Sequence, residues 1–367
     1  MKKAFIFLVI TALLITLCAC AAGNETTTAA KCSEETEPKL TMNPEIETKE
    51  PQTQEPTQTE APFITTEAPA ANGAEFNIYS LKGPTTMGIV TLLEESKNGN
   101  TVNTYHSTIC AAADEVTAAI VNGDADIALL PANAAAALYN KAGGFSVVAI
   151  NTLGVLYLVE NGDTVQSVED LAGKTVCLTG KGTTPEYSLR YLLASYGIED
   201  QVNLEFKSEA QEVVAALSED MSMIGLLPQP FVIAAMMQNE NLRIAVDLNS
   251  EWNTVSADSS LVTGVTVVRT EVLEKNPEAV KAFLKEAAEG VDQVNSDPEA
   301  AAKLIAELGI VNKDVIAAKA IPFCNLVCID GAGMKDMLSG YLKTLFDQNP
   351  KAVGGSMPAE EFYYTGE

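Results

Sequence analysis

The sequence predicts an α/β fold of two lobes, each built on a mixed, mainly parallel sheet, with two hinge strands joining the lobes. Three observations lead to this prediction. Apolar strand-like segments alternate with helical segments from residue 76 onward, which is typical of proteins with parallel sheets. One strand–helix order occurs twice, and a β-rich run follows each copy. The chain of 367 residues is also long enough for more than one hydrophobic core.

The first copy of the repeat begins with a buried strand at residues 76–81. A helix is expected at residues 84–96, opened by the turn that contains Lys82 and Gly83. A helix at residues 115–122 and an apolar strand at residues 126–131, which ends in a proline, complete this copy.

The second copy has the same order and nearly the same length. Its strand covers residues 174–179, and a turn rich in glycine and threonine opens a helix that ends near Gly197. A helix at residues 213–218 and a strand at residues 223–228, again ending in a proline, complete it. Two segments this similar indicate two related lobes.

Two β-rich runs, residues 150–159 and 259–268, each contain a central glycine and are expected to cross between the lobes. Two connecting strands permit closure about a hinge. We therefore expect the first lobe at residues 75–152, the second at residues 153–262, and a return to the first lobe at residues 263–367.

The last third of the chain is expected to be helical and to belong to the first lobe. Asn276, Pro277 and Glu278 are a cap, a first-turn proline and an acid, in the order that starts a helix. A second helix is predicted from about residue 296 to residue 308, and a third at residues 334–346.

The first residues predict export. Residues 1–19 read as a signal peptide, with two lysines followed by an apolar stretch too short to span a membrane. The stretch ends in Leu17-Cys18-Ala19-Cys20, which is similar to the bacterial lipobox and predicts a lipid on Cys20. The alternative is an ordinary signal peptide with incidental cysteines.

Residues 20–74 are rich in Thr, Glu and Pro and poor in apolar residues, so they are expected to form a disordered acidic tether. A flexible chain of this length reaches roughly 40 Å. Such a tether would hold a folded domain away from an anionic membrane and suits a bacterium with a single membrane.

The charge of the chain excludes nucleic-acid binding. It has 23 basic and 49 acidic residues, a formal net charge of −26, whereas phosphate binding needs a basic surface. An acidic surface also argues against direct adhesion to anionic lipid. We expect a monomer that touches the membrane only through its lipid.

Candidate reactive residues are few. Five cysteines besides those of the lipobox are expected to be free buried thiols, with a Cys324–Cys328 disulfide as the alternative: Cys32, Cys110, Cys177, Cys324 and Cys328. None has the spacing and histidine partners of a zinc site, so neither a metal nor a cofactor is expected. The sole histidine, His106, and the sole tryptophan, Trp252, are both expected to be structural, although stacking of Trp252 on a ligand is an alternative.

Four segments carry a resemblance to a known family: residues 170–176, 181–184, 227–231 and 276–284. Over roughly residues 76–346, the chain resembles the bacterial solute-binding proteins of the nitrate/sulfonate/taurine and thiamine-precursor type. The resemblance implies a type II periplasmic-binding fold and delivery of a small molecule to an ABC permease. The permease would be the direct partner of the protein and would connect it with an ATPase.

The resemblance and the turn residues together predict the ligand site. The family's ligand-side loops map onto twelve residues: Lys82, Gly83, Thr85, Thr86, Met87, Asn133, Lys181, Thr183, Thr184, Glu186, Gln229 and Phe231. Hydroxyls, lysines and free N–H groups at helix starts favour an anion, whereas a glutamate favours an amine. The first loop lacks the aromatic or glutamine residue expected of sulfonate binders, so that ligand is not carried over. These turns could also be plain helix starts.

The sequence therefore predicts an extracytoplasmic substrate-binding lipoprotein of an ABC importer, which is not an enzyme. It would lie at the outer face of the cytoplasmic membrane and trap a small polar ligand that is anionic or zwitterionic. Two alternatives stay open: an enzyme of the related thiamine-precursor or menaquinone type, and a sensory lipoprotein.

Overall fold

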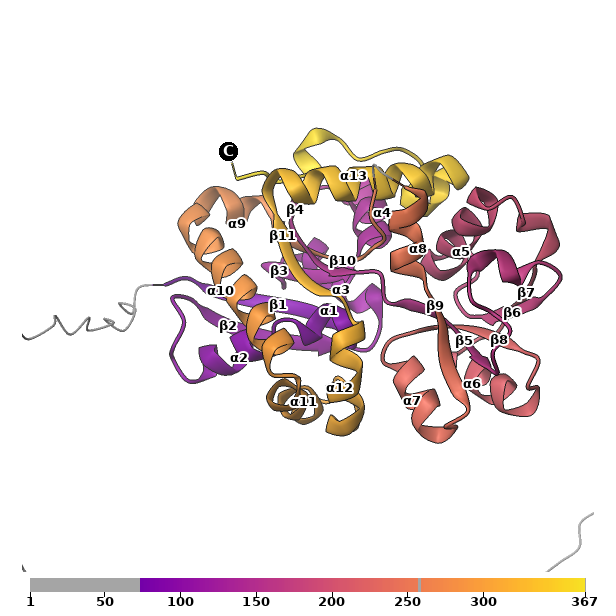
Figure 1. The fold of residues 1–367 in the computed structure, drawn as a ribbon. Helices are drawn as coiled ribbons and strands as arrows, with labels where there is room; N and C mark the ends of the chain where they lie inside the picture. Colours follow the sequence, from indigo (N-terminus) through magenta and orange to yellow (C-terminus); the bar gives the residue numbers. More distant parts are fainter. Residues whose placement is uncertain (1–72, 257–258, 367) are drawn as a thin grey trace, which may run out of the picture. The chain divides into compact units, whose positions relative to one another are not determined.

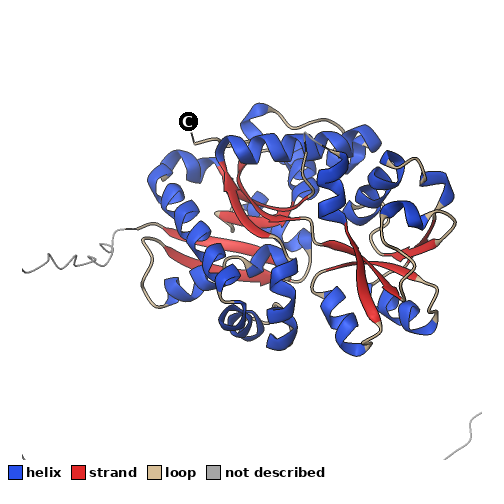
Figure 2. Ribbon diagram, in the orientation of Figure 1, coloured by secondary structure: helices blue, strands red, loops and turns tan. Residues whose placement is uncertain are grey.

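Two mixed sheets form the centre of the chain, which a computed structural model describes at residues 73–256 and 259–366 (Figures 1 and 2). Sheet A has the strand order β11-β4-β10-β3-β1-β2, and sheet B has the order β7-β6-β8-β5-β9. The strands of sheet A are β1 (Glu75–Leu81), β2 (Thr104–Cys110), β3 (Ile127–Pro131), β4 (Phe145–Leu153), β10 (Val262–Arg269) and β11 (Leu326–Asp330). Those of sheet B are β5 (Leu156–Asn161), β6 (Thr175–Leu178), β7 (Asn203–Phe206), β8 (Ile224–Pro228) and β9 (Leu242–Asp247).

Helices flank both sheets (Figure 2). The helices of the first repeat and the one after it are α1 (Pro84–Met87), α2 (Val90–Lys97), α3 (Ala113–Asn122) and α4 (Ala132–Ala142). Those that follow the strands of sheet B are α5 (Thr184–Ser195), α6 (Ala210–Glu219), α7 (Phe231–Gln238) and α8 (Leu248–Val255). The last five are α9 (Thr270–Lys275), α10 (Pro277–Ser296), α11 (Pro298–Glu307), α12 (Asp314–Ala320) and α13 (Gly331–Gln348).

The strand pairing confirms the predicted repeat and the α/β fold class. β1 runs parallel to β2 and β3 in sheet A, and β6 runs parallel to β7 and β8 in sheet B. β10 then joins β3, and β5 joins β8, both antiparallel. The two sheets thus share one plan, in which the carboxyl ends of the parallel strands carry the turns that open the helices.

The two crossings differ from their predicted extents. Instead of one strand over residues 150–159, β4 ends in sheet A and β5 starts in sheet B, with Gly154 and Val155 between them. A Cβ atom on Gly154 would lie 2.7 Å from Leu261 Cδ2, so this close approach requires glycine. The second predicted crossing is also shorter, because β10 begins at Val262 and lies wholly in sheet A. The lobe boundaries at residues 152 and 262 stay predictions.

Several helix predictions need correction. The helix expected at residues 84–96 is broken into α1 and α2, because Ile89, with φ −108° and ψ 7°, leaves the helical conformation between them. The Asn276 side chain makes no capping hydrogen bond, whereas the Asp297 carboxylate accepts one from Ala300 N at 3.0 Å. The sequence prediction missed α12 and β11.

Apolar packing holds the two sheets together. One cluster of buried side chains takes residues from both, among them Leu130 and Ile150 of sheet A and Leu158 and Leu226 of sheet B. None of the helices in the described part of the chain is long and apolar enough to cross a membrane. The predicted signal peptide, the lipid on Cys20 and the tether up to residue 72 lie outside the described residues.

Candidate functional site

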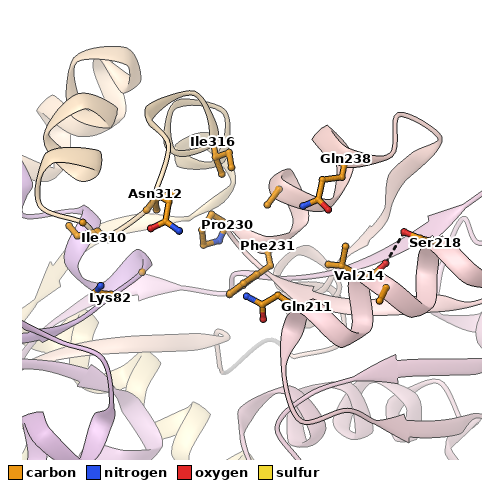
Figure 3. Close-up of a pocket in the computed structure, with 15 residues that line it drawn as sticks. Lys82, Gln211, Val214, Ser218, Pro230, Phe231, Gln238, Ile310, Asn312 and Ile316 are labelled. Carbon is orange, nitrogen blue, oxygen red and sulfur yellow. Dashed lines mark hydrogen bonds between the residues drawn. The ribbon is translucent and has the colours of Figure 1, made fainter. Parts of the chain in front are cut away.

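A cleft of about 570 Å³ lies where the first turn of sheet A faces α6 and α7 from the sheet B side (Figure 3). The turn contributes Lys82 and Gly83, and α7 contributes Phe231. The segment between α11 and α12 forms a third wall, with Ile310 and Asn312. Residues far apart in the sequence therefore enclose one space, which is large enough for a small molecule.

The cleft lining is mainly apolar, with polar groups that are amides and hydroxyls. Gln211, Gln238 and Asn312 supply the amides, and Lys82 is the single charged residue among the described residues of the lining. No aspartate or glutamate lines this space in the described chain, although the whole sequence carries 49 acidic residues. The lining thus favours a neutral or anionic ligand with an apolar part.

The turn after β1 orders its own backbone. Gly83 has a φ of 117°, which favours glycine, and its carbonyl accepts hydrogen bonds from Thr86 N at 3.1 Å and Met87 N at 3.2 Å. Lys82 is exposed, and its N–H donates to Cys110 O at 3.2 Å. The lysine side chain is therefore at the cleft without any ion pair among the described residues.

Three of the twelve predicted residues lie just inside that turn and do not line the cleft. The hydroxyls of Thr85 and Thr86 both donate back to Leu81 O, and Met87 is buried with the residues of α11 and α12. Thr85 packs its methyl group against Gly264, where a Cβ atom would lie 2.5 Å away. These side chains shape the turn, and their contact with a ligand stays a prediction.

The equivalent turn after β6 lies apart from the cleft. Lys181 and Thr183 are exposed, and the Thr183 hydroxyl donates to Gly180 O at 2.6 Å. The Lys181 ammonium lies 5.5 Å from the centre of the Phe206 ring. Neither side chain lines the described cleft, so the structure separates the two lysines that the repeat made equivalent.

Glu186 already has a cationic partner. Its carboxylate accepts hydrogen bonds from Gly182 N at 2.6 Å and from Arg190 Nε at 2.8 Å. Burial raises the pKa of Glu186, but these hydrogen bonds outweigh burial and hold that pKa below its ordinary value. An amine on a ligand would have to compete with Arg190 for this carboxylate.

A polar seam of side chains on α4, α5 and α13 links the two halves of the structure outside the cleft lining. The Thr184 hydroxyl on α5 donates to Asn133 Oδ1 on α4 at 3.4 Å. Thr184 and Ser188 also lie near the buried Tyr341 hydroxyl on α13. Burial raises the pKa of Tyr341 to about 12, while the two hydroxyls act to lower it. The structure thus brings two predicted residues, Asn133 and Thr184, to each other across the sheets.

The turn after β8 places Pro230 and Phe231 in the cleft lining, directly after Gln229. The Gln229 side chain is only 2 % exposed. Together with Lys82 and Gly83, Phe231 completes the predicted residues that line the cleft. The sequence prediction missed Gln211, Gln238 and Asn312 as lining residues. The only local signal was the amphipathic pattern of residues 211–218, which indicates a helix but not what its exposed face contacts.

Residues expected to be structural lie outside the cleft lining. His106 is exposed, with its Nε2 atom 3.8 Å from Glu75 Oε2. Trp252 is fully buried between the rings of Tyr191 and Tyr341, at centroid distances of 4.4 and 5.7 Å. No cluster of histidine, cysteine or acidic side chains in the described chain could hold a metal ion.

Four cysteines lie in the described chain, and all four are free: Cys110, Cys177, Cys324 and Cys328. Burial raises the pKa of the Cys328 thiol to about 11, which keeps it protonated and unreactive at neutral pH. Cys324 and Cys328 therefore do not form the alternative disulfide, and Cys32 lies outside the described residues.

Comparison with known proteins assigns the chain to a family. The profile described as NMT1/THI5 like matches residues 108–301, just over half of the sequence. No curated protein sequence matches the chain.

Solved structures share its fold. An ABC transporter from Parabacteroides distasonis is 23% identical, with a TM-score of 0.65, over 79% of this chain and 98% of its own. The periplasmic aliphatic sulphonate-binding protein SsuA from Escherichia coli is 16% identical, with a TM-score of 0.61, over 80% of this chain and 94% of its own. A ligand-binding component of an ABC-type import system from Staphylococcus aureus is 14% identical, with a TM-score of 0.57, over 79% of this chain and 98% of its own. The predicted periplasmic-binding fold is confirmed.

Proposed function

The chain belongs to the NMT1/THI5-like family, and from this membership we propose that it is the substrate-binding protein of an ABC importer. It traps one small molecule between its two sheets and delivers it to the permease, which is coupled to an ATPase. The resemblance of its fold to binding components of ABC importers supports this proposal. It acts as a monomer and catalyses no reaction.

The observation that carries the proposal is the cleft, because its walls come from both halves of the structure. Lys82 and Ile310 lie on the sheet A side, and Phe231 and Gln211 lie on the sheet B side. Two crossings connect the halves, at Gly154 and between α8 and β10. Rotation about two such connections would open the cleft and close it again around a ligand.

The lining suggests the class of ligand. An apolar wall with several amides suits a molecule that has both an apolar body and polar groups. Since the described lining has a lysine and no acid, a neutral, anionic or zwitterionic molecule fits better than a cation. Where such a ligand is anionic or zwitterionic, we propose that its negative group lies near Lys82.

A panel of solutes tests the function. The domain from about residue 74, made without its anchor, should be monomeric and bind one compound from a panel of sulfonates, pyrimidines, carboxamides and amino acids, measured by thermal shift and then calorimetry. Turnover of a compound without stable binding would support the enzyme alternative and contradict the transport role.

Thr184→Val should weaken binding by about tenfold, because it removes the hydrogen bond that links α5 to Asn133 across the two sheets. Thr183→Val is the matched control: its hydroxyl bonds within its own turn, to Gly180 O, so affinity should hold. Calorimetry with the compound found in the panel measures both variants. Equal affinities in the two variants would show that the hydrogen bond between Thr184 and Asn133 does not contribute to ligand binding.

We further propose that the protein is a lipoprotein at the outer face of the cytoplasmic membrane of a bacterium with a single membrane. Lipid on Cys20 would keep it near the permease, with residues 20–74 as the tether. Cys20→Ser should release the protein into the medium, and Cys18→Ser should not, because bulky Leu17 precedes Cys18 whereas small Ala19 precedes Cys20. Fractionation of cells with an antibody measures this. Retention of the Cys20→Ser protein in the membrane would contradict the anchor.

A further inference from the structure

Gln229 has a buried side-chain amide that makes no hydrogen bond. In the described chain its side chain is 2 % exposed, and neither Nε2 nor Oε1 has a partner. Only its main chain is engaged, through the N–H donated to Val155 O at 3.0 Å. Leaving a buried polar group unpaired destabilises the folded state, so such a group calls for an explanation.

Asn103 shows what a structural amide looks like in the same protein. It is also 2 % exposed, yet every polar atom of its side chain is used. Its Nδ2 donates to Tyr105 Oη at 3.0 Å and to Ala279 O at 2.9 Å, and its Oδ1 accepts from Ala74 N at 3.1 Å. Burial alone therefore does not leave an amide unpaired in this chain.

The place of Gln229 connects it with the cleft. It follows the carboxyl end of β8, where ligands bind in open α/β sheets. Gln229 itself is buried and does not line the described cleft, but the next two residues, Pro230 and Phe231, both line it. Other buried unpaired atoms in the described chain differ from it. Ser188 and Tyr341 have each other as neighbours, Ser80 offers a single rotatable hydroxyl, and Arg269 is bound through its other two guanidinium nitrogens, to Asp126 and Glu271.

We propose that the Gln229 carboxamide forms its hydrogen bonds with the ligand, and that the ligand carries a hydrogen-bond donor and an acceptor side by side. A carboxamide presents one acceptor and two donors in a plane. A ligand carboxamide or lactam pairs with both of its atoms, whereas a carboxylate or a sulfonate offers acceptors alone. This inference rests on the proposed function.

The stability of the unliganded protein tests whether the Gln229 amide is unpaired when no ligand is bound. Gln229→Met keeps the length of the side chain and removes its amide, so the melting temperature of the dialysed full-length protein should stay equal or rise. Asn103→Leu, the matched control, removes a satisfied amide and should lower it by about 4–8 °C. A fall as large for Gln229→Met as for Asn103→Leu would overturn the inference, because the amide would then be paired in the unliganded protein.

Three matched pyridines test which chemical group of a ligand pairs with Gln229. Nicotinamide, nicotinate and pyridine-3-sulfonate share a ring and differ in the group that would meet Gln229. Calorimetry of the wild-type chain should give a dissociation constant at least tenfold lower for nicotinamide than for the other two. In Gln229→Met this preference should disappear.

The outcomes separate the inference from the function on which it rests. Wild-type binding of nicotinate or the sulfonate that equals or exceeds that of nicotinamide, or no binding of any of the three, overturns the assigned ligand class. The proposed function stays supported after such a result if the chain still binds another solute of the panel. It is contradicted if no solute binds at all.

Discussion

Gly154→Ala is expected to destabilise the protein by about 2 kcal/mol and to weaken ligand binding more than any single change inside the cleft. The added Cβ would lie 2.7 Å from both Asn249 Cβ and Leu261 Cδ2. The carbonyl of Gly154 also accepts a hydrogen bond from Asn325 Nδ2 at 2.5 Å, and its N–H donates to Asn249 Oδ1 at 3.3 Å. Both bonds hold the first crossing, so displacing the glycine disturbs closure as well as packing.

Further contacts show why this crossing is sensitive. Asn325 is the one residue other than glycine with a positive φ, 46°, in the described chain, and its carbonyl accepts the N–H of Leu153 at 3.1 Å. Nearby, the Tyr157 hydroxyl of sheet B donates to Phe323 O at 2.7 Å. The segment before β11, through Phe323 and Asn325, thus forms hydrogen bonds with residues on both sides of the crossing.

Gly333→Ala is the control for this prediction. Gly333 lies in α13 with no positive φ, and a Cβ there would meet only Ile329 Cγ2, at 3.5 Å. Alanine should therefore raise stability by about 0.5–1 kcal/mol. Urea unfolding measures both variants. Equal stabilities for Gly154→Ala and the wild type would show that the crossing has room for a side chain.

Phe231→Ala should weaken ligand binding by about tenfold to a hundredfold. Its ring is the only aromatic group in the described cleft lining, and burying such a ring against a ligand contributes about 1.5–3 kcal/mol. Met237→Ala is the control, because Met237 lies on the same helix, is 42% exposed and does not line the cleft. Calorimetry with a compound from the solute panel measures both. An unchanged affinity in Phe231→Ala would place the ligand elsewhere.

The repeat could be predicted because its signals are local. Residues 76–81 and 174–179 are short apolar runs, and the glycine-rich turns that follow them appear in the structure as turns. The fold class followed from the order of these elements. By contrast, the prediction missed α12 and β11, since the short alanine-rich run at Asp314–Ala320 and the run at Leu326–Asp330 have weak patterns of their own.

The site could be predicted only in part, because it depends on which surfaces meet. The turns correctly predicted that Lys82, Gly83 and Phe231 line a shared space. The repeat also implied that Lys181 would lie beside the ligand, but the structure places Lys181 outside the cleft lining. The wall from the segment before α12 depends on long-range packing that no local pattern records. The pairing of Glu186 with Arg190 was missed as well, although their spacing of four residues on one helix is visible in the sequence.

Native mass spectrometry of the protein purified without denaturant tests the central claim, that the cleft traps one small molecule. We expect a single compound bound to wild-type protein in a one-to-one ratio, and its loss from Phe231→Ala at the same protein concentration. A wild-type spectrum without any bound compound, or a compound equally retained by Phe231→Ala, would show that the cleft does not trap a ligand.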